Sequence, residues 1–283
     1  MILSPSHGAM NREEGGPQVH DPNRGSAGPL EVALVLRLRA AGCVFAEDEA
    51  RLLVGSGLRG AELEHLVQRR VMGEPLEHIL GWVDFCGLRL AVGPGVFVPR
   101  QRSALLVECA AEVTPEGATV LDLCCGCGAL GAALAYLVGG IALHATDISR
   151  DAVGLARENL PAGAQCYEGD LFGALPAALR GTVHTLLCNS PYVPSDQLRT
   201  LPPEARLHEP RATLDGGADG LDIHRRVAAE ARAWLRPGGH LLFEVSDEQE
   251  TAGLGLLQEQ GFRAWSRDRA EMGATVVIGR APA

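Results

Sequence analysis

The residues best suited to chemistry stand in one short segment, Asn189-Ser190-Pro191-Tyr192, directly after an apolar run. A planar amide or amine nitrogen has a delocalised lone pair, so a methyltransferase must hold its two N–H hydrogens and aim the lone pair at the methyl donor. The Asn189 side-chain oxygen and the Ser190 backbone carbonyl can each accept one of these hydrogens. The segment therefore has the groups that methylation of such a nitrogen requires.

The same acceptors would oppose the positive charge that grows on the nitrogen during transfer, while Tyr192 would stack on the flat face of the target. No general base is needed beforehand, because the attacking nitrogen is neutral and loses its proton afterwards. Taken alone, the residues Asn-Ser-Pro are also typical of an ordinary turn. Its position at the end of a buried strand favours the interpretation as an active site.

Short β-rich runs alternate with helical segments from residue 118 onward. This alternation predicts an α/β domain whose mostly parallel sheet is covered on both faces. Such sheets bind ligands at the carboxyl ends of their strands, near the switch in strand order. The predicted strands are 119–123, 141–146, 183–188, 240–245 and 274–278, and the predicted helices are 128–138, 151–160, 220–235 and 247–260.

A glycine-containing loop, Gly126-Cys127-Gly128, joins the first of these strands to the following helix. Glycine allows a tight turn and a close approach to a ligand, and a helix start offers unpaired N–H groups. The six residues from Gly126 to Gly131 also match the G-x-G-x-x-G fingerprint of nicotinamide sites. A dehydrogenase is disfavoured, because the second half of the chain shows no Tyr and Lys at helical spacing for hydride transfer.

Two carboxylates end strand-like runs at the same predicted edge. Asp147 can accept both hydroxyls of a ribose, as an acidic residue does after the second strand of nucleotide-binding βαβ units. Asp170 is placed to meet an adenine amino group. The alternative is that each Asp only caps the helix that follows it. The spacing between the glycine turn and Asp147 favours the ribose contact.

Three regions precede the α/β domain. Residues 1–28 are rich in Gly, Pro, Asn and charge, which predicts a disordered tail. Residues 29–81 place apolar side chains at helical spacing and predict a small helical domain. Residues 82–100 begin with alternating apolar and polar positions around a glycine, which is typical of a β-hairpin linker. Residues 101–283 then form the α/β domain.

Composition and charge narrow the function further. The net charge of -10, from 35 acidic and 25 basic residues, disfavours binding to nucleic acid or anionic lipid. No run approaches the roughly 18 apolar residues of a membrane helix, and the first residues do not resemble a signal peptide, so a cytoplasmic protein is expected. The cluster Cys124, Cys125 and Cys127 lacks the spacing of a metal finger, so no metal is expected.

An ordered set of segments resembles the protein-(glutamine-N5) methyltransferases, class I enzymes that modify the Gly-Gly-Gln loop of bacterial peptide chain release factors. The resemblance covers most of the chain from about Leu30 onward. It implies a helical N-terminal domain that helps to bind the protein substrate, a β-hairpin linker, and a Rossmann-like domain with a seven-stranded sheet whose last strand is antiparallel. The segments that carry it are Glu74-Pro75-Leu76, His78–Gly81, Pro94–Arg100, the glycine loop, Asp147, Asn189–Tyr192, Glu209-Pro210-Arg211, Leu214–Leu221 and Leu235–Gly239.

The resemblance also implies S-adenosyl-L-methionine as cofactor, S-adenosyl-L-homocysteine as product and a release factor as protein substrate. It assigns catalysis to Asn189, Ser190, Pro191 and Tyr192, and substrate binding to Asn189, Pro191, Tyr192 and Glu209. The cofactor contacts that it implies are Phe97, Pro99, Arg100, Asp122, Cys124, Gly126, Cys127, Gly128, Asp147, Ile148, Asp170, Leu171, Phe172 and Asn189.

Three segments depart from the pattern of that family. Ser190 replaces the first Pro of Asn-Pro-Pro-Tyr, which keeps a backbone carbonyl but makes the loop less rigid. Cys124 and Cys125 replace a Gly and a small polar residue, and Gln101-Arg102-Ser103 replaces a Pro-Glu-Thr type segment. These changes resemble a divergent paralogous branch. They keep a second hypothesis open, an N-methyltransferase of a small-molecule metabolite in a biosynthetic pathway.

Overall fold

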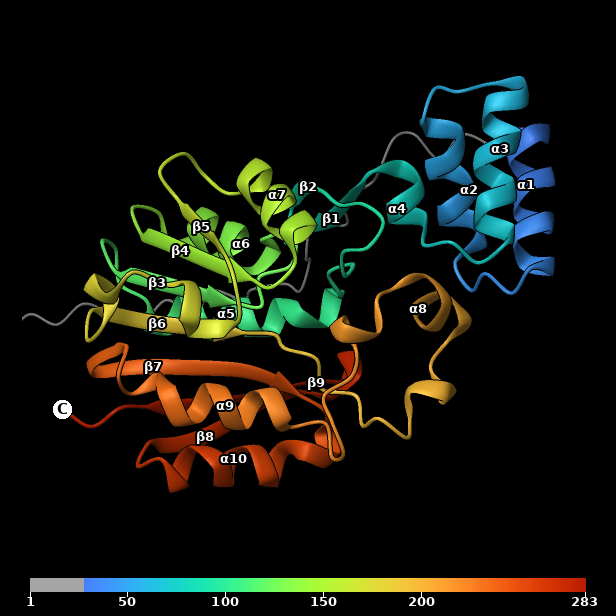
Figure 1. Cartoon of the computed structure of the whole chain (residues 1–283). Helices are drawn as coiled ribbons and strands as arrows, with labels where there is room; N and C mark the ends of the chain where they lie inside the picture. The colour runs from blue at the N-terminus through green and yellow to red at the C-terminus, as the bar shows by residue number, and fades with distance from the viewer. Residues whose placement is uncertain (1–27) are drawn as a thin grey trace, which may run out of the picture.

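The structure, a computed structural model, describes residues 28–283. The tail predicted at residues 1–28 lies outside the described residues, apart from Gly28. In chain order, the described residues form a small helical group, a two-stranded linker and a larger α/β domain (Figure 1).

The N-terminal helices are α1 (Pro29–Ala40), α2 (Ala46–Gly55), α3 (Gly60–Val71) and α4 (Leu76–Leu80). Apolar side chains three or four positions apart share one helix face, so they turn toward one another and form a separate core that includes Leu38, Leu53 and Val67. Within this group, Arg70 and Glu49 form a buried ion pair with 2.6 Å between Nε and Oε2. The pair joins α3 to α2 with charge-assisted hydrogen bonds.

The linker is an antiparallel hairpin of β1 (Trp82–Phe85) and β2 (Leu88–Ala91). Its two turn residues, Cys86 and Gly87, both have positive φ values of 49° and 78°, as the tightest hairpin turns require. The Asn159 side chain ties the hairpin to the α/β domain: it accepts from the Ala91 N–H at 2.7 Å and donates to the Ala91 carbonyl at 2.8 Å. The hairpin is thereby held against the domain that follows it.

The α/β domain contains a seven-stranded sheet in the order β5-β4-β3-β6-β7-β9-β8. Only β9 runs antiparallel to its neighbours, β7 and β8. The strand order reverses at β3, because β4 and β6 flank it on opposite sides. The strands are β3 (Thr119–Leu123), β4 (Ala142–Asp147), β5 (Gln165–Glu168), β6 (Val183–Cys188), β7 (Leu235–Val245), β8 (Arg263–Arg269) and β9 (Ala274–Arg280).

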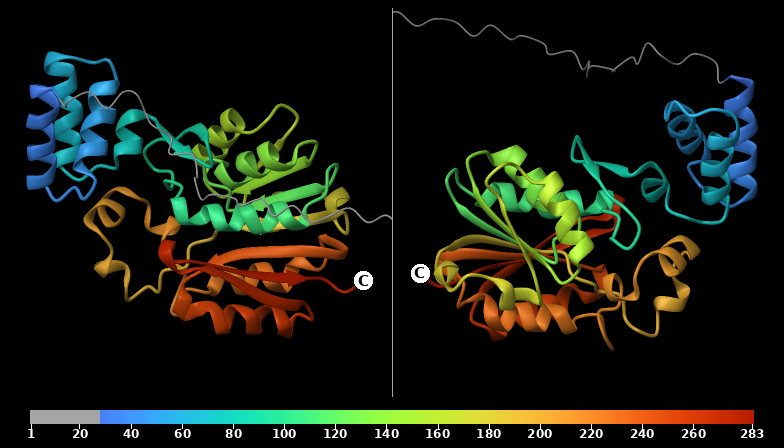
Figure 2. Two further views of the ribbon diagram at one scale, coloured as in Figure 1. Left: turned by 180° about the vertical axis from the view of Figure 1, so that it is seen from behind. Right: turned by 45° about the horizontal axis from the view of Figure 1, so that its top comes forward.

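Helices cover both faces of the sheet (Figure 2). One apolar core lies on each side of it. One core receives side chains from α5 (Ala104–Val113), α6 (Ala129–Val138) and α7 (Arg150–Asn159), and the other from α9 (Asp222–Ala231) and α10 (Glu250–Glu259). Within the described part of the chain, none of the helices has the length and apolar character that crossing a membrane requires. The arrangement is the Rossmann-like sandwich that the sequence predicted.

Two strands of the sheet were not predicted, β5 and β8. Both lie at the edges of the sheet, where one side of the strand has no partner and side chains are only partly buried. Edge strands of this kind carry polar residues and lack a clear apolar pattern. By contrast, the fully buried β6 was predicted with its observed bounds.

Candidate active site

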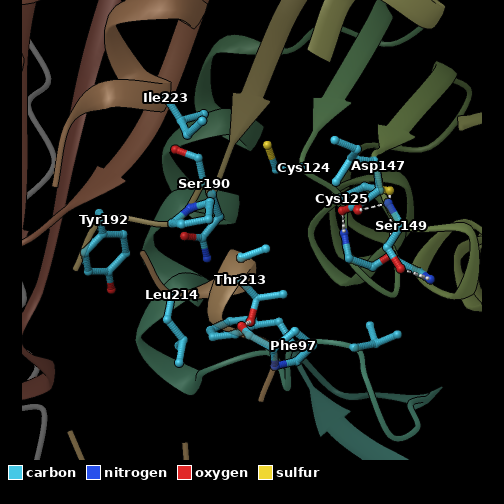
Figure 3. Close-up of a pocket in the computed structure, with 18 of the residues that line it drawn as sticks. Phe97, Cys124, Cys125, Asp147, Ser149, Ser190, Tyr192, Thr213, Leu214 and Ile223 are labelled. Carbon is cyan, nitrogen blue, oxygen red and sulfur yellow. Dashed lines mark hydrogen bonds between the residues drawn. The ribbon is translucent and has the colours of Figure 1, made fainter. Parts of the chain in front are cut away.

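A cavity of about 1050 Å³ lies at the carboxyl ends of β3, β4 and β6, beside the reversal in strand order. Ligand pockets in proteins commonly measure about 300–1,000 Å³, so it has room for a nucleotide-sized ligand together with part of a second molecule. Figure 3 shows Ser190 and Tyr192 on one side and Asp147 with Ser149 on the other. Its lining residues belong to segments 95–103, 124–130, 146–152, 169–171, 189–193, 201–215 and 223–226.

The glycine loop turns sharply as it leaves β3. Cys124 and Gly126 both have a φ of 55°, a left-handed conformation that glycine adopts readily. The Asp147 carboxylate, at the end of β4, accepts the Gly126 N–H at 2.9 Å and the Ser149 N–H at 2.9 Å. Since a carboxylate oxygen can accept more than one hydrogen bond, Asp147 holds the loop in place and still has acceptor capacity at the cavity wall.

The helix-cap alternative for the two carboxylates is wrong. Ser149 caps α7 through a bond from the Ala152 N–H, and Asp147 does not take part in it. Asp170 makes no side-chain cap to the short 3-10 helix η2 (Leu171–Ala174) either. Instead, its half-exposed carboxylate lines the cavity and pairs with Arg226 on α9 at 2.6 Å. Both carboxylates therefore line the cavity, and neither makes a side-chain cap bond to the helix that follows it.

The Asn189–Tyr192 segment leaves β6 at the opposite wall and follows no regular turn. The Asn189 side-chain amide donates from Nδ2 to the Ser103 hydroxyl at 3.0 Å. Ser190 is almost completely buried, with its hydroxyl 3.4 Å from Nδ1 of His224. The interpretation of this segment as an isolated surface turn is thus excluded by its position at the cavity.

Tyr192 is fixed through its hydroxyl group. The hydroxyl donates to Oε1 of Glu244 at 2.8 Å and accepts from Nη2 of Arg102 at 2.6 Å. Burial, reinforced by the nearby Glu244 carboxylate, raises the pKa of Tyr192 above its usual range. The phenol therefore stays protonated, and the ring rather than the hydroxyl is free to contact a ligand.

All eight cysteines are free thiols, and the three in the glycine loop are held in the protonated form. Burial raises the pKa of Cys127 to about 12 and the pKa of Cys125 well above its usual range. Among residues 28–283, no group of three or more His, Cys, Asp or Glu side chains is placed to hold a metal ion. The loop cysteines act as small packing residues around the turn.

Comparisons with known proteins agree with this geometry. A family model described as the methyltransferase small domain matches residues 88–205. A release factor glutamine methyltransferase from Geobacter sulfurreducens is 38% identical over 200 residues, which are 70% of this chain and 69% of that protein. Another from Bradyrhizobium diazoefficiens is 34% identical over 261 residues, 82% of this chain and 87% of that protein. The chain belongs to the release factor glutamine methyltransferase family.

Membership of the release factor glutamine methyltransferase family makes the chain a methyltransferase, and the family implies a reaction that depends on S-adenosylmethionine. Among solved structures, a methyltransferase from Pyrococcus furiosus matches with a TM-score of 0.53 and 16% identity, covering 70% of this chain and 90% of that chain. At this identity the likeness concerns the fold alone. It agrees with the Rossmann-like sheet described above.

Four residues predicted to contact cofactor or substrate do not line the cavity in this member of the release factor glutamine methyltransferase family. Asp122 is completely buried beneath the loop, where it accepts the Gly131 N–H at 2.9 Å, and burial raises its pKa to about 7. Gly128 turns its Cα toward Ala156 and Leu160, where an added Cβ would be crowded at 3.1–3.2 Å. These two residues shape the loop from behind.

The other two are held by neighbouring side chains. Phe172 lies in the core, stacked on Trp234 with 5.5 Å between ring centroids. The Glu209 side chain is fully buried and pairs with Arg100 at 2.8 Å. Its carboxylate is thus already neutralised and has no exposed surface for a substrate. The remaining predicted site residues all line the cavity.

The sequence did not reveal the roof of the cavity, residues 201–215. It consists of a short helix, α8 (Pro203–His208), a 3-10 turn, η5 (Arg211–Thr213), and irregular chain. Such segments have no apolar period, and only the family-like runs Glu209–Arg211 and Leu214–Leu221 pointed to this part of the chain. Arg102 and Ser103, recognised only as departures from the family pattern, also line the cavity.

Proposed function

We propose that this chain transfers the methyl group of S-adenosylmethionine to the side-chain nitrogen N5 of a glutamine in a peptide chain release factor. One observation carries the proposal. The Asn189–Tyr192 segment and the glycine loop with Asp147 lie on opposite walls of a single cavity. The names of the relatives from Geobacter and Bradyrhizobium support the choice of acceptor.

The residues around the glycine loop fit S-adenosylmethionine. Asp147 has free acceptor capacity for ribose hydroxyls, and Asp170 lies farther along the same wall. Ile148, 69% exposed, offers an apolar surface on which a flat base can rest. The backbone at Gly126 leaves open space where a Cβ would stand. S-adenosylmethionine, when bound, supplies a methyl group activated by a positively charged sulfur.

The acceptor nitrogen would lie at the opposite wall. The Asn189 side-chain oxygen and the Ser190 carbonyl accept its two N–H hydrogens, and the Tyr192 ring packs against the amide plane. His224, behind Ser190, is neutral, because burial lowers its pKa to about 4. No charged base stands at the nitrogen in this scheme, and the released proton passes to solvent after transfer.

The N-terminal helices are suited to hold the rest of a protein substrate. Arg70 of α3 reaches Glu204 of α8 with 2.9 Å between Nη1 and Oε2, so these helices adjoin the cavity roof (Figure 2). Large apolar side chains are exposed in the N-terminal helical group and in α8, among them Phe45 at 69%, Met72 at 77% and Leu207 at 63%. Exposed apolar side chains of this kind are suited to a protein partner. We assign residues 29–81 to substrate binding and 82–100 to the linker.

Incubation with purified release factors and S-adenosylmethionine, followed by mass spectrometry of the Gly-Gly-Gln peptide, tests the proposal. We expect one added methyl group on the glutamine, and a strongly reduced amount in the same incubation time with Asn189→Ala. Calorimetry with S-adenosylhomocysteine serves as the control for an intact cofactor site. Cofactor binding without any methylated glutamine would contradict the proposal and favour a small-molecule acceptor, the reaction suggested by the departures at Ser190 and Arg102.

A further inference from the structure

A short 3-10 turn, η1 (Gln101–Ser103), touches both residues that define the acceptor wall. Ser103 contacts Asn189, which is 86 positions later in the chain, and Arg102 contacts Tyr192, which is 90 positions later. This turn lies where the sequence departs from the Pro-Glu-Thr type segment. Its contacts show which residues of the cavity wall Arg102 and Ser103 hold.

The Asn189 amide directs its NH₂ group to the Ser103 hydroxyl and its oxygen away from it. A side-chain amide has an acceptor oxygen on one side and a donor NH₂ on the other. The Ser103 hydroxyl is buried and lies 3.0 Å from Nδ2, so it takes up a hydrogen of the NH₂ group. The acceptor oxygen is left for the ligand. In the reverse orientation, the NH₂ group would donate to the target nitrogen and compete for its lone pair.

Arg102 supports the second residue of the wall. Its Nε donates to Oε1 of the buried Glu244 at 3.1 Å, and its Nη2 donates to the Tyr192 hydroxyl at 2.6 Å. The Tyr192 hydroxyl in turn donates to the same Glu244 oxygen at 2.8 Å. Three mutually bonded groups fix the tilt of the ring, and the guanidinium compensates a carboxylate that burial would otherwise destabilise.

We propose that the η1 turn is the positioning element of the acceptor site: Ser103 orients the Asn189 amide with its oxygen toward the substrate, and Arg102 sets the plane of the Tyr192 ring. Both act through residues that touch the substrate. The assignment to an acceptor site rests on the proposed function, whereas the contacts themselves are independent of it.

The Ser103 contact is tested without turnover. The chain has four asparagines, so selective ¹⁵N-asparagine labelling of the full-length protein yields four side-chain NH₂ pairs, and the pair lost in Asn189→Ala identifies Asn189. We expect Ser103→Ala to shift that pair and Ser103→Thr to keep it near its original position. Ser266→Ala removes a hydroxyl on the far edge strand β8 that donates to Glu250 of α10, and it should leave the Asn189 pair unchanged. An unshifted Asn189 pair in Ser103→Ala would overturn the assignment.

Kinetics test the consequence for transfer. We expect Ser103→Ala to lower kcat about tenfold without changing the affinity for S-adenosylmethionine, with recovery in Ser103→Thr. Arg102→Gln should raise the KM for the acceptor about fivefold, and adding it to Tyr192→Phe should cause no further loss. Arg267→Gln is the matched control, because Arg267 pairs with Glu112 away from the cavity.

Strict additivity of Arg102→Gln and Tyr192→Phe would show that Arg102 does not act through the hydroxyl. If the wild-type protein methylates no glutamine, the proposed function fails, but the asparagine resonances still decide whether Ser103 orients Asn189. The two failures are therefore distinguishable.

Discussion

The two walls of the cavity are built in different ways. The wall proposed to hold the cofactor, formed by the glycine loop and Asp147, is held by bonds between neighbouring strand ends. Asp147 at the end of β4 accepts backbone N–H groups of Gly126, 21 positions earlier, and of Ser149, two positions later. The acceptor wall depends on side chains from distant parts of the chain. Ser103 lies 86 positions from Asn189, and Glu244 lies 52 positions from Tyr192.

This difference predicts how each wall responds to the departures from the family pattern. Backbone bonds at a strand end depend on few side chains, so the cofactor wall tolerates replacements such as Cys124 while Asp147 keeps its bonds. The acceptor wall changes when any one of its supporting side chains changes. Under the proposed function, we expect the substitutions at 101–103 and at Ser190 to affect the acceptor and not the cofactor.

The largest effect that separates the two walls is expected from Asn189→Ala. The variant removes an acceptor that interacts more strongly in the transition state, so kcat should fall about 100- to 1000-fold. Cofactor affinity should remain within about twofold of wild type, since Asp147 and the glycine loop are untouched. Turnover assays and calorimetry measure the two quantities. Equal losses in both would mean that the walls are not separate.

A smaller effect is expected from Asp147→Ala, which should weaken cofactor affinity and not kcat. The variant removes the ribose acceptor and releases the Gly126 N–H, so cofactor affinity should weaken about 10- to 100-fold. At saturating cofactor, kcat should be largely retained. Isothermal titration with S-adenosylhomocysteine measures the affinity, and Asp151→Ala on the neighbouring helix α7 is the control. A large loss of kcat with normal affinity would contradict the ribose assignment.

A change that loosens the roof of the cavity, residues 201–215, should affect only the binding of the acceptor. Glu209→Gln weakens the buried pair with Arg100, so residues 201–215 should be held less firmly. We expect the KM for the release factor to rise about fivefold, with cofactor affinity unchanged. Glu112→Gln, which disrupts an exposed pair with Arg267, is the control. An unchanged KM would mean that Glu209 has no part in holding the roof for the acceptor.

The smallest expected effect concerns the free energy of unfolding and not turnover. Its pH dependence should have opposite signs for a buried group behind each wall. Asp122, under the cofactor wall, has a pKa raised to about 7 from 3.8 by burial, so its contribution is full at low pH and is lost as the pH rises through 7. His224, behind the acceptor wall, has a pKa lowered to about 4 from 6.5 by burial. Its contribution is full above pH 6.5 and is lost as the pH falls through 4.

Denaturant unfolding between pH 4 and pH 8 measures both contributions. Relative to Asp122→Asn, the wild type should lose stability as the pH rises. Relative to His224→Gln, it should lose stability as the pH falls. Slopes of the same sign would contradict this difference between the two walls.

Much of the fold could be predicted because its signals are local. β3 and β6 are short apolar runs at the centre of the sheet, and both were predicted with their observed bounds. The edge strands β5 and β8 were missed, because one-sided pairing leaves their side chains partly exposed and the apolar pattern weak. Local pattern thus located the centre of the sheet better than its edges.

The candidate site also has residues that local sequence pattern located and residues that it did not. Asp147 and Asn189 could be placed at one sheet edge from the sequence, since parallel strands bring their carboxyl ends together. The cavity has both at its walls. Phe172 and Glu209 were predicted as ligand contacts, but the structure turns Phe172 onto Trp234 and Glu209 onto Arg100. Such pairings join distant parts of the chain and leave no period or spacing in the sequence.

By itself, the sequence determined the alternation of strands and helices in an α/β domain and the residue types available at Asn189–Tyr192, because residue types and short-range spacing specify both. Only the tertiary structure decided which side chains hold that segment. The bonds from Asn189 to Ser103 and from Arg102 to Tyr192 exist because packing of the sheet and α5 brings η1 beside the end of β6. The direction in which an amide or a ring faces depends on these long-range contacts, and residue order alone does not specify it.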